Sequence, residues 1–82
     1  MANQQEVKVP VLGEDIKEVE VSFWLKEAGE TVKEGEEIVE VLSDKAVFRI
    51  SAPGAGKLEK ILKKEGEKVK IGETLGVVVG EP

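Results

Sequence analysis

The stretch LKEAGETVKEGE at residues 25–36 returns as LKKEGEKVKIGE at residues 62–73, an offset of 37 residues. The leucine, the valine, both lysines, both glycines and two glutamates recur in register, and Val41 matches Val78 at the same offset. Glycines at matched positions indicate matched tight turns that need positive φ. Two copies are too few for a solenoid, which needs about three. The repeat therefore predicts two similar halves, related by an approximate two-fold axis and each supplying four strands.

Short apolar runs rich in valine and isoleucine lie between the glycines. Residues 7–11 and 19–21 alternate apolar and polar side chains with a period of two, which is typical of strands. Residues 57–64 could also form one face of a short helix. Their counterpart in the first half, residues 20–27, includes the strand-like VSFW at residues 21–24, so we expect a strand here too, and a small sandwich or barrel overall. The expected core residues are Val9, Val21, Val32, Ile38, Val41, Val47, Ile50, Leu58, Ile61, Val69, Leu75 and Val78.

The residue inventory excludes several classes of site. The 82 residues include no cysteine, histidine or tyrosine, so we expect no disulfide, no zinc or haem site and no conventional catalytic triad. The net charge of −5 argues against nucleic-acid binding. No apolar run approaches the ~20 residues of a membrane span, so we expect no membrane association. The expected location is cytoplasmic, or the mitochondrial matrix if the source is eukaryotic.

The link between the two halves carries one lysine at a distinctive place. Ser43-Asp44 is a turn signal between two apolar strands, which places Lys45 at the exposed tip of a hairpin. Under the two-fold, the counterpart of this tip falls near both chain ends. Residues 1–44 carry twelve acids and four lysines, a net charge of −8, and residues 45–82 carry five acids and eight bases, a net charge of +3. The sequence leaves open whether this asymmetry guides recognition or reflects two solvated faces.

Several motifs match one known family. They are VPVLGEDI at residues 9–16, Asp-Lys-Ala at residues 44–46, and Gly29 and Gly56, which lie sixteen residues before the motif lysine and eleven after it. With the repeat, they resemble the lipoyl domain of the dihydrolipoyl acyltransferases in 2-oxo acid dehydrogenase complexes, a branch of the biotinyl/lipoyl attachment domains. The resemblance covers nearly everything from residue 6 to residue 80. It implies an all-β fold, a flattened β-barrel or sandwich of two four-stranded antiparallel sheets with quasi-two-fold symmetry, whose turns include both glycines.

The resemblance also implies a function. Lys45 would carry lipoic acid in covalent amide linkage, and the domain would be a non-catalytic swinging-arm carrier in an acyltransferase chain. The lipoyl group would supply the two sulfurs that this chain lacks. It would be reductively acylated by a thiamine-diphosphate-dependent 2-oxo acid decarboxylase, deliver the acyl group to CoA at the acyltransferase catalytic domain, and be reoxidised by dihydrolipoyl dehydrogenase. A lipoyl ligase or lipoyl transferase would attach it, and we expect the isolated domain to be monomeric.

Residues around the lysine are expected to guide partner recognition, again by the resemblance. They comprise the two neighbours of the lysine and a loop expected beside the hairpin, and are Asp44, Ala46, Leu12, Gly13, Glu14 and Asp15. The common family pattern has glycine where Asp15 stands. This departure leaves the conformation of the loop and the choice of partner open.

Two functions of other classes remain open from the sequence. A biotin carrier domain of a carboxylase shares the fold and the hairpin lysine, but its signature has methionine on both sides of the lysine, where this chain has Asp44 and Ala46. An unmodified barrel used as an adaptor module, as in membrane-fusion proteins, would not need Lys45. Along the chain we expect a disordered N-terminal tail at residues 1–5, the lipoyl domain at residues 6–80 and the start of a linker at residues 81–82. The sequence does not identify the 2-oxo acid.

Overall fold

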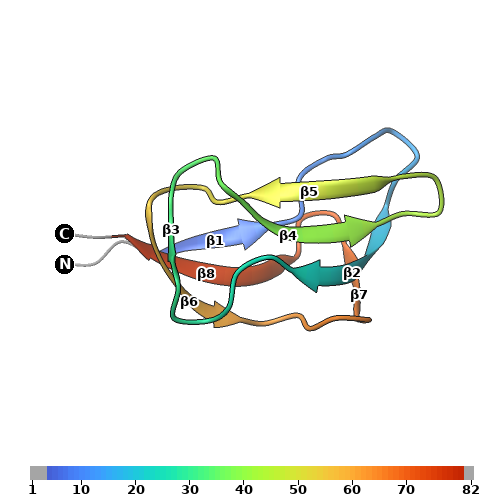
Figure 1. The fold of residues 1–82 in the computed structure, drawn as a ribbon. Coiled ribbons are helices and arrows are strands. Elements are labelled where there is room, and N and C mark those ends of the chain that lie inside the picture. The colour runs from blue at the N-terminus through green and yellow to red at the C-terminus, as the bar shows by residue number, and fades with distance from the viewer. Residues whose placement is uncertain (1–3, 81–82) are drawn as a thin grey trace.

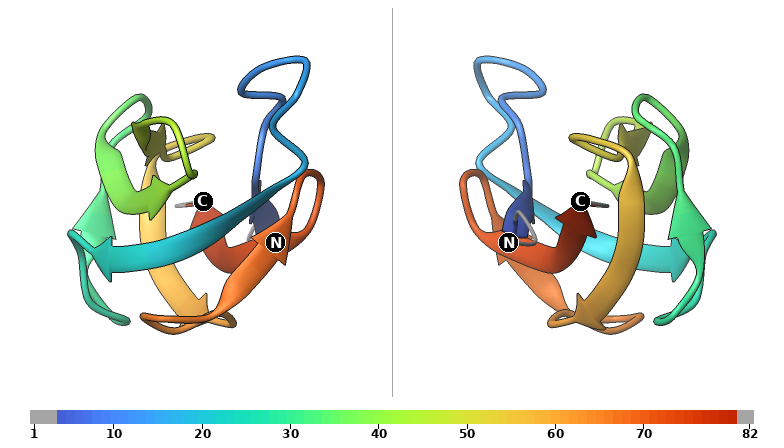
Figure 2. Two further views of the ribbon diagram at one scale, coloured as in Figure 1. Left: turned by 90° about the vertical axis from the view of Figure 1, so that its right-hand side faces the viewer. Right: turned by 90° about the vertical axis from the view of Figure 1, so that its left-hand side faces the viewer.

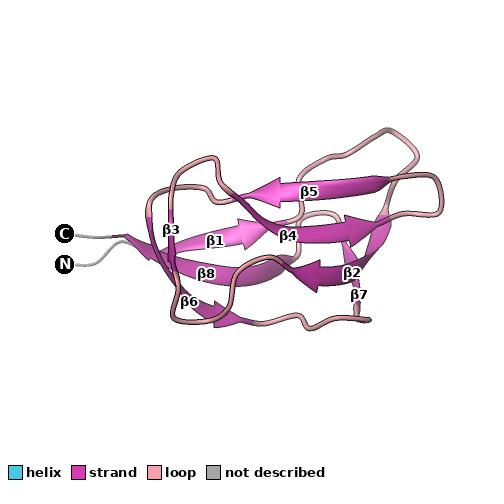
Figure 3. Cartoon of the chain, in the orientation of Figure 1, coloured by secondary structure: helices cyan, strands magenta, loops and turns pink. Residues whose placement is uncertain are grey.

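The computed structural model describes residues 4–80, which form eight β-strands and no helix (Figures 1 and 3). This part of the chain therefore has no helix that could cross a membrane. The all-β prediction is confirmed, and the segment at residues 57–64 is a strand over residues 57–61, as the repeat predicted. The strands are β1 (Gln4–Lys8), β2 (Glu18–Trp24), β3 (Thr31–Val32), β4 (Glu37–Leu42), β5 (Val47–Ser51), β6 (Gly56–Ile61), β7 (Lys68–Lys70) and β8 (Thr74–Gly80).

The strands form two antiparallel four-stranded sheets that face each other (Figure 2). One sheet has the order β1-β8-β6-β3 and the other the order β5-β4-β2-β7. The molecule measures 39 × 21 × 17 Å along its principal axes, so the sandwich is elongated and flattened. These features confirm the predicted flattened sandwich of two four-stranded sheets.

The internal repeat relates the two sheets strand by strand. The offset of 37 residues matches β2 with β6, β3 with β7 and β4 with β8, and the two-fold then relates β5 to β1, which converts one strand order into the other. Backbone hydrogen bonds follow the same offset of 37 residues, since Gly29 N–H donates to the carbonyl of Leu58 and Gly66 N–H donates to the carbonyl of Val21, at 2.7 and 2.8 Å. The register also shifts at equivalent points, between Val21 and Phe23 in β2 and between residues 58 and 60 in β6. The predicted quasi-two-fold is thus present in the strand order, the hydrogen bonds and the bulges.

Four equivalent tight turns carry the repeated glycines. Gly29, Gly35, Gly66 and Gly72 have φ of 97°, 82°, 88° and 91°, and no other residue within 4–80 has a positive φ. Each glycine is followed by a glutamate whose carboxylate accepts a hydrogen bond from the backbone N–H three residues earlier, as Glu36 does from Lys33 at 2.9 Å. The repeat therefore encodes the turn geometry twice over, in glycine conformation and in side-chain capping.

A single apolar core lies between the sheets. Ten of the twelve expected core residues are buried, and the core also includes Val7, Val19, Val39 and Ala52, which the prediction missed. Val47 was wrongly placed in the core, because it is 57% exposed. It lies three residues from the buried Ile50, and side chains an odd number of positions apart on a strand face opposite sides. Ile61 is only partly buried and packs against the core, on the same face as Leu58 because the bulge between residues 58 and 60 adds a residue to the strand.

Two expected boundaries differ in the structure. The first strand begins at Gln4, so residues 4 and 5, expected in a disordered tail, pair with Val79 and Val78 of β8. Residues 1–3 and 81–82 lie outside the described part. Gly56, expected in a turn, instead begins β6. Its lack of a side chain has another cause, because a Cβ there would lie 2.1 Å from the carbonyl oxygen of Val79 on the neighbouring strand.

Candidate functional site

Lys45 lies at the tip of the β4–β5 hairpin, at the end of the molecule opposite both ends of the described chain (Figure 1). The two-fold explains this position. The β4–β5 hairpin is the counterpart of the antiparallel pair β8 and β1, whose outer ends are residues 80 and 4. The lysine therefore lies on the turn of one half of the fold, and the equivalent position in the other half is the open end formed by residues 80 and 4, as the repeat predicted.

Ser43 fixes the backbone of this tip. Its N–H donates to the carbonyl of Ala46 at 2.8 Å and closes a four-residue turn. Its hydroxyl oxygen accepts from the backbone N–H of Lys45 at 3.1 Å and of Ala46 at 3.0 Å, and it donates to the Ala46 carbonyl at 3.2 Å. The side chain of Lys45 is 59% exposed. A defined turn thus presents a long, accessible primary amine.

The loop between β1 and β2 (residues 9–17, the β1–β2 loop) reaches the same end of the molecule (Figure 2). Its base is attached to the β7–β8 turn by backbone hydrogen bonds, including those between Val9 and Glu73 at 3.0 Å and between Ile71 and Lys17 at 3.1 Å. Leu12 and Ile16 pack against the core. The tip of the loop, with exposed Glu14 and Asp15, is left to face the hairpin.

The structure brings Lys45 and Asp15 together. The Nζ atom of Lys45 donates a hydrogen bond to Oδ2 of Asp15 and forms an ion pair with it, although thirty residues separate the two in sequence. Among residues 4–80, this is the only side-chain hydrogen bond or ion pair that joins the β1–β2 loop to the hairpin. The position at which the chain departs from the common family pattern is therefore the one that contacts the lysine.

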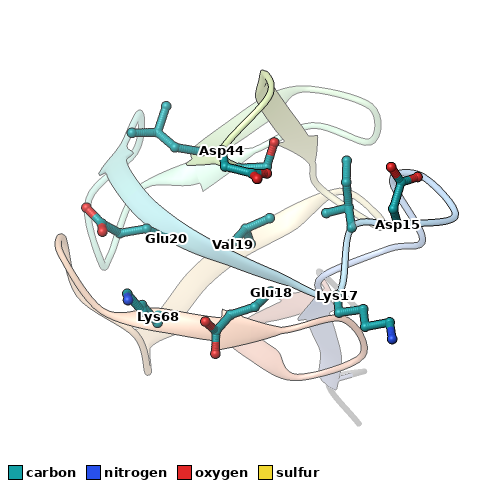
Figure 4. Close-up of a pocket in the computed structure, with 10 residues that line it drawn as sticks. Asp15, Lys17, Glu18, Val19, Glu20, Asp44 and Lys68 are labelled. Atoms are coloured by element: carbon teal, nitrogen blue, oxygen red, sulfur yellow. The ribbon is translucent and has the colours of Figure 1, made fainter.

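A shallow groove lies beside this contact, with a volume of about 550 Å³. Asp15 and Asp44 contribute to its rim from the loop and the hairpin, and Glu18 and Glu20 contribute from β2 (Figure 4). Lys68 of β7 lines it as well, and it is the cross-strand partner of Glu20. The groove is thus mostly acidic around a partly apolar floor.

Not all predicted recognition residues have the same environment. Asp44, Ala46, Glu14 and Asp15 are exposed, whereas Leu12 and Gly13 are only partly exposed. The prediction did not single out Ser43, Glu18, Glu20 and Lys68 as site residues. The alternation around buried Val19 and Val21 is the signal that turns both glutamates outward.

The perturbed ionisable groups lie away from the hairpin tip. The backbone N–H of Lys33 and the ammonium of Lys26, 3.0 Å from the carboxylate, lower the pKa of Glu36. The hydrogen bond that Lys26 donates to the Glu36 carboxylate raises the pKa of Lys26. Hydrogen bonds to Glu40 and Glu37 raise the pKa of Arg49 in β5. Within residues 4–80 no cluster of three or more acidic side chains is arranged to hold a metal ion.

A family model described as "Biotin-requiring enzyme", which covers biotin and lipoyl attachment domains, matches residues 5–78. The chain belongs to this family. A solved lipoyl domain of the 2-oxoglutarate dehydrogenase complex from Azotobacter vinelandii is 38% identical, with a TM-score of 0.71 over 93% of this chain and 95% of that one. The expected lipoyl-domain family is therefore confirmed.

Longer proteins also match this lipoyl domain. The dihydrolipoyllysine-residue succinyltransferase components of 2-oxoglutarate dehydrogenase complexes from Bartonella vinsonii and Bacillus subtilis are 42% and 38% identical over 73 residues. These 73 residues are 89% of this chain but 18% of each relative, so the chain spans less than a fifth of their length. Urea carboxylase from Kluyveromyces lactis shares the fold, with a TM-score of 0.79 over 93% of this chain and 6% of that one, at 20% identity.

Proposed function

We propose that Lys45 is the lipoylated residue of this carrier domain, and that the domain serves a 2-oxoglutarate dehydrogenase complex. The observation that carries the proposal is the position of Lys45. It is an exposed amine at the tip of a rigid hairpin, in a chain that belongs to the biotin and lipoyl attachment family. The assignment to a 2-oxoglutarate complex is supported by the lipoyl domain and the succinyltransferases that the chain resembles.

The residues at the tip fit a covalently attached lipoyl group. Such a group needs an accessible amine, and the side chain of Lys45 is 59% exposed on a turn closed by Ser43. When bound, the group supplies two sulfurs that can be reduced, accept an acyl group and be reoxidised. The chain contributes presentation. The flexible lysine stem allows reach, and the hydrogen-bonded turn fixes where that reach begins, which raises the effective concentration of the arm at a docked active site.

A series of partner enzymes follows from this proposal. A thiamine-diphosphate-dependent 2-oxoglutarate decarboxylase would load the arm, an acyltransferase catalytic domain would pass the acyl group to CoA, and dihydrolipoyl dehydrogenase would reoxidise the arm. A lipoyl ligase or lipoyl transferase would recognise the hairpin beforehand. The non-methionine neighbours of the lysine, Asp44 and Ala46, support lipoyl rather than biotin attachment.

Intact mass spectrometry after co-expression with a lipoyl ligase tests the modification. We expect one lipoyl increment on the parent domain and none on Lys45→Arg, which keeps the positive charge but offers no amine. Lys60→Arg, at another exposed lysine, is the matched control and should still gain the increment. A lipoyl increment on Lys45→Arg would refute the assignment. A biotin increment on the parent after co-expression with a biotin ligase would favour the carboxylase alternative instead.

Reductive acylation of the lipoylated domain tests the choice of complex. Radiolabelled 2-oxo acids are supplied with the decarboxylase of the 2-oxoglutarate, pyruvate or branched-chain complex, and label on the domain is measured. We expect the fastest labelling with the 2-oxoglutarate decarboxylase. Faster labelling by either of the others would overturn this choice, and no labelling by any would favour an adaptor role.

A further inference from the structure

The contact between Asp15 and Lys45 depends on the charge of the lysine. Asp15 is 72% exposed and Lys45 59% exposed, so the contact is an ion pair at the surface. The base of the β1–β2 loop is fixed by hydrogen bonds from residues 9 and 17 to the β7–β8 turn. Within residues 4–80, no other side-chain hydrogen bond or ion pair holds the tip of this loop to the hairpin. The position of the loop tip is therefore sensitive to the state of one amine.

Attachment of lipoic acid changes the Lys45 amine from a charged to a neutral group. Lys45 loses a proton, its nitrogen lone pair attacks the carbonyl carbon of an activated carboxylic acid such as a mixed anhydride, and a C–N bond forms. The bond from the carbonyl to the leaving group breaks, and the leaving group departs with the electron pair. The nitrogen then loses a second proton, so the product is a neutral amide with one N–H in place of an ammonium with three. The carboxylate of Asp15 then loses its ion pair with Lys45, while Asp44 lines the same groove with a like charge. Lys17 and Lys68 also line this groove but form no ion pair with Asp15.

We propose that the Asp15–Lys45 ion pair is a latch, which holds the β1–β2 loop against the hairpin in the unmodified domain and opens when Lys45 is lipoylated. This rests on the proposed lipoylation of Lys45. The loop then presents a free carboxylate next to the arm in the modified domain alone. A partner enzyme that docks on this loop can therefore distinguish the lipoylated domain from the unmodified one. The ligase that attaches the lipoyl group binds the domain with the ion pair still formed.

Variants that alter charge without lipoylation test the latch directly. Lys45→Arg keeps a cation at the tip, whereas Lys45→Gln is neutral like the amide. The probe is the backbone amide spectrum of residues 13–16 by ¹⁵N–¹H NMR, with ¹⁵N relaxation for mobility. We expect Lys45→Gln and Asp15→Asn to shift these amides and increase their mobility, and Lys45→Arg to stay near the parent. Glu20→Gln, which removes another acid from the groove without touching Lys45, is the control and should leave the loop unchanged.

The size of the effect follows from the exposure of the pair. Exposed ion pairs favour the paired state by a factor of about 1.5 to 5, so the latch shifts a population and does not lock it. Screening by salt should therefore move the loop amides of the parent toward those of Lys45→Gln at about 1 M NaCl, where the Debye length is about 3 Å.

Lipoylation then closes the test. Once intact mass shows a complete increment on the parent, its loop amides should move toward those of Lys45→Gln, and the same modification of Asp15→Asn should leave the loop amides unchanged. Loop amides that are identical in Lys45→Gln and Lys45→Arg, or equally displaced in both, would overturn the latch even if lipoylation occurs. A missing mass increment would instead refute the proposed function, because the unmodified variants report on the latch independently.

Discussion

Replacing Gly56 with alanine should disrupt the pairing of strands β6 and β8. The new Cβ would lie 2.1 Å from the carbonyl oxygen of Val79, and real Cβ atoms essentially never approach closer than 3.0 Å, so the two backbones must separate by at least about 0.9 Å. Because both atoms belong to fixed positions in paired strands, no side-chain rotation can relieve the clash. The pairing of Gly56 with Gly80 at the end of β8 is the first to be lost.

The expected cost can be worked from these contacts. Overpacking costs about 1–3 kcal/mol, and each weakened ladder hydrogen bond adds about 0.5–1.5 kcal/mol. Alanine also lowers the conformational entropy of the unfolded chain, which offsets about 0.4–1 kcal/mol of this loss. With one weakened hydrogen bond, these terms add to a net loss in the free energy of unfolding of about 0.5–4 kcal/mol, centred near 2 kcal/mol, a large share of the roughly 4–12 kcal/mol expected for 82 residues. At about 4–8 °C per kcal/mol, a loss of about 2 kcal/mol should lower the melting temperature by about 8–16 °C.

Thermal unfolding followed by circular dichroism measures this loss, and Gly54→Ala is the matched control. Its Cβ would lie 2.3 Å from Oε1 of Gln5, the end of a flexible side chain that has no hydrogen-bond partner among the described residues. A rotation of Gln5 relieves that clash, so the control should change the melting temperature by less than about 5 °C. Equal losses in the two variants, or a loss below about 0.5 kcal/mol in Gly56→Ala, would refute the steric reasoning.

Three further predictions follow from the turns and their caps. Gly29 and Gly66 lie in equivalent turns with φ of 97° and 88° and have open space where a Cβ would be. Chemical denaturation of Gly29→Ala and Gly66→Ala should therefore show similar losses in the free energy of unfolding, about 1–2 kcal/mol each. Losses that differ by more than twofold would contradict the symmetry. Ser43→Ala removes the acceptor for two backbone N–H groups at the hairpin tip, and calorimetry should show about 1 kcal/mol less stability, together with slower lipoylation; an unchanged rate would show that the ligase does not need the fixed turn. The lowered pKa of Glu36 means that its contribution to stability is present above its ordinary value of 4.5 and is lost as the pH falls through its folded-state pKa. Unfolding measured between about pH 5 and pH 3 should therefore show a smaller acid loss in Glu36→Gln than in the parent, and equal losses would argue against this cause.

The repeat made most of the fold predictable from the sequence. Matched glycines implied matched positive-φ turns, and all four have that geometry. The two-fold also predicted that Lys45 lies opposite the ends of the chain. These inferences succeeded because they depend on local backbone conformation and on symmetry, both of which a sequence repeat records directly.

The features that were not predicted depend on how distant segments meet. The family resemblance placed the loop of residues 12–16 beside the hairpin and its acidic residues near Lys45. No local sequence pattern specifies the contact between Asp15 and Lys45, since it is set by the path of a loop attached to the β7–β8 turn. Gly56 was expected in a turn, because its need for no side chain arises from the carbonyl of Val79 on another strand. Val47 is apolar and lies in a strand, yet its register relative to Ile50 turns it outward. Register and cross-strand distances are tertiary properties.

The correspondence between the β4–β5 hairpin and the β8–β1 pair makes the fold open to circular permutation. Gln4 and Val79 are antiparallel neighbours, so a short turn could join residue 80 to residue 4 without disturbing either sheet. If that turn were a copy of Ser-Asp-Lys-Ala, the closed domain would present a lysine at each end of its 39 Å axis. A cut in any other surface turn would then yield a carrier with two opposed arms.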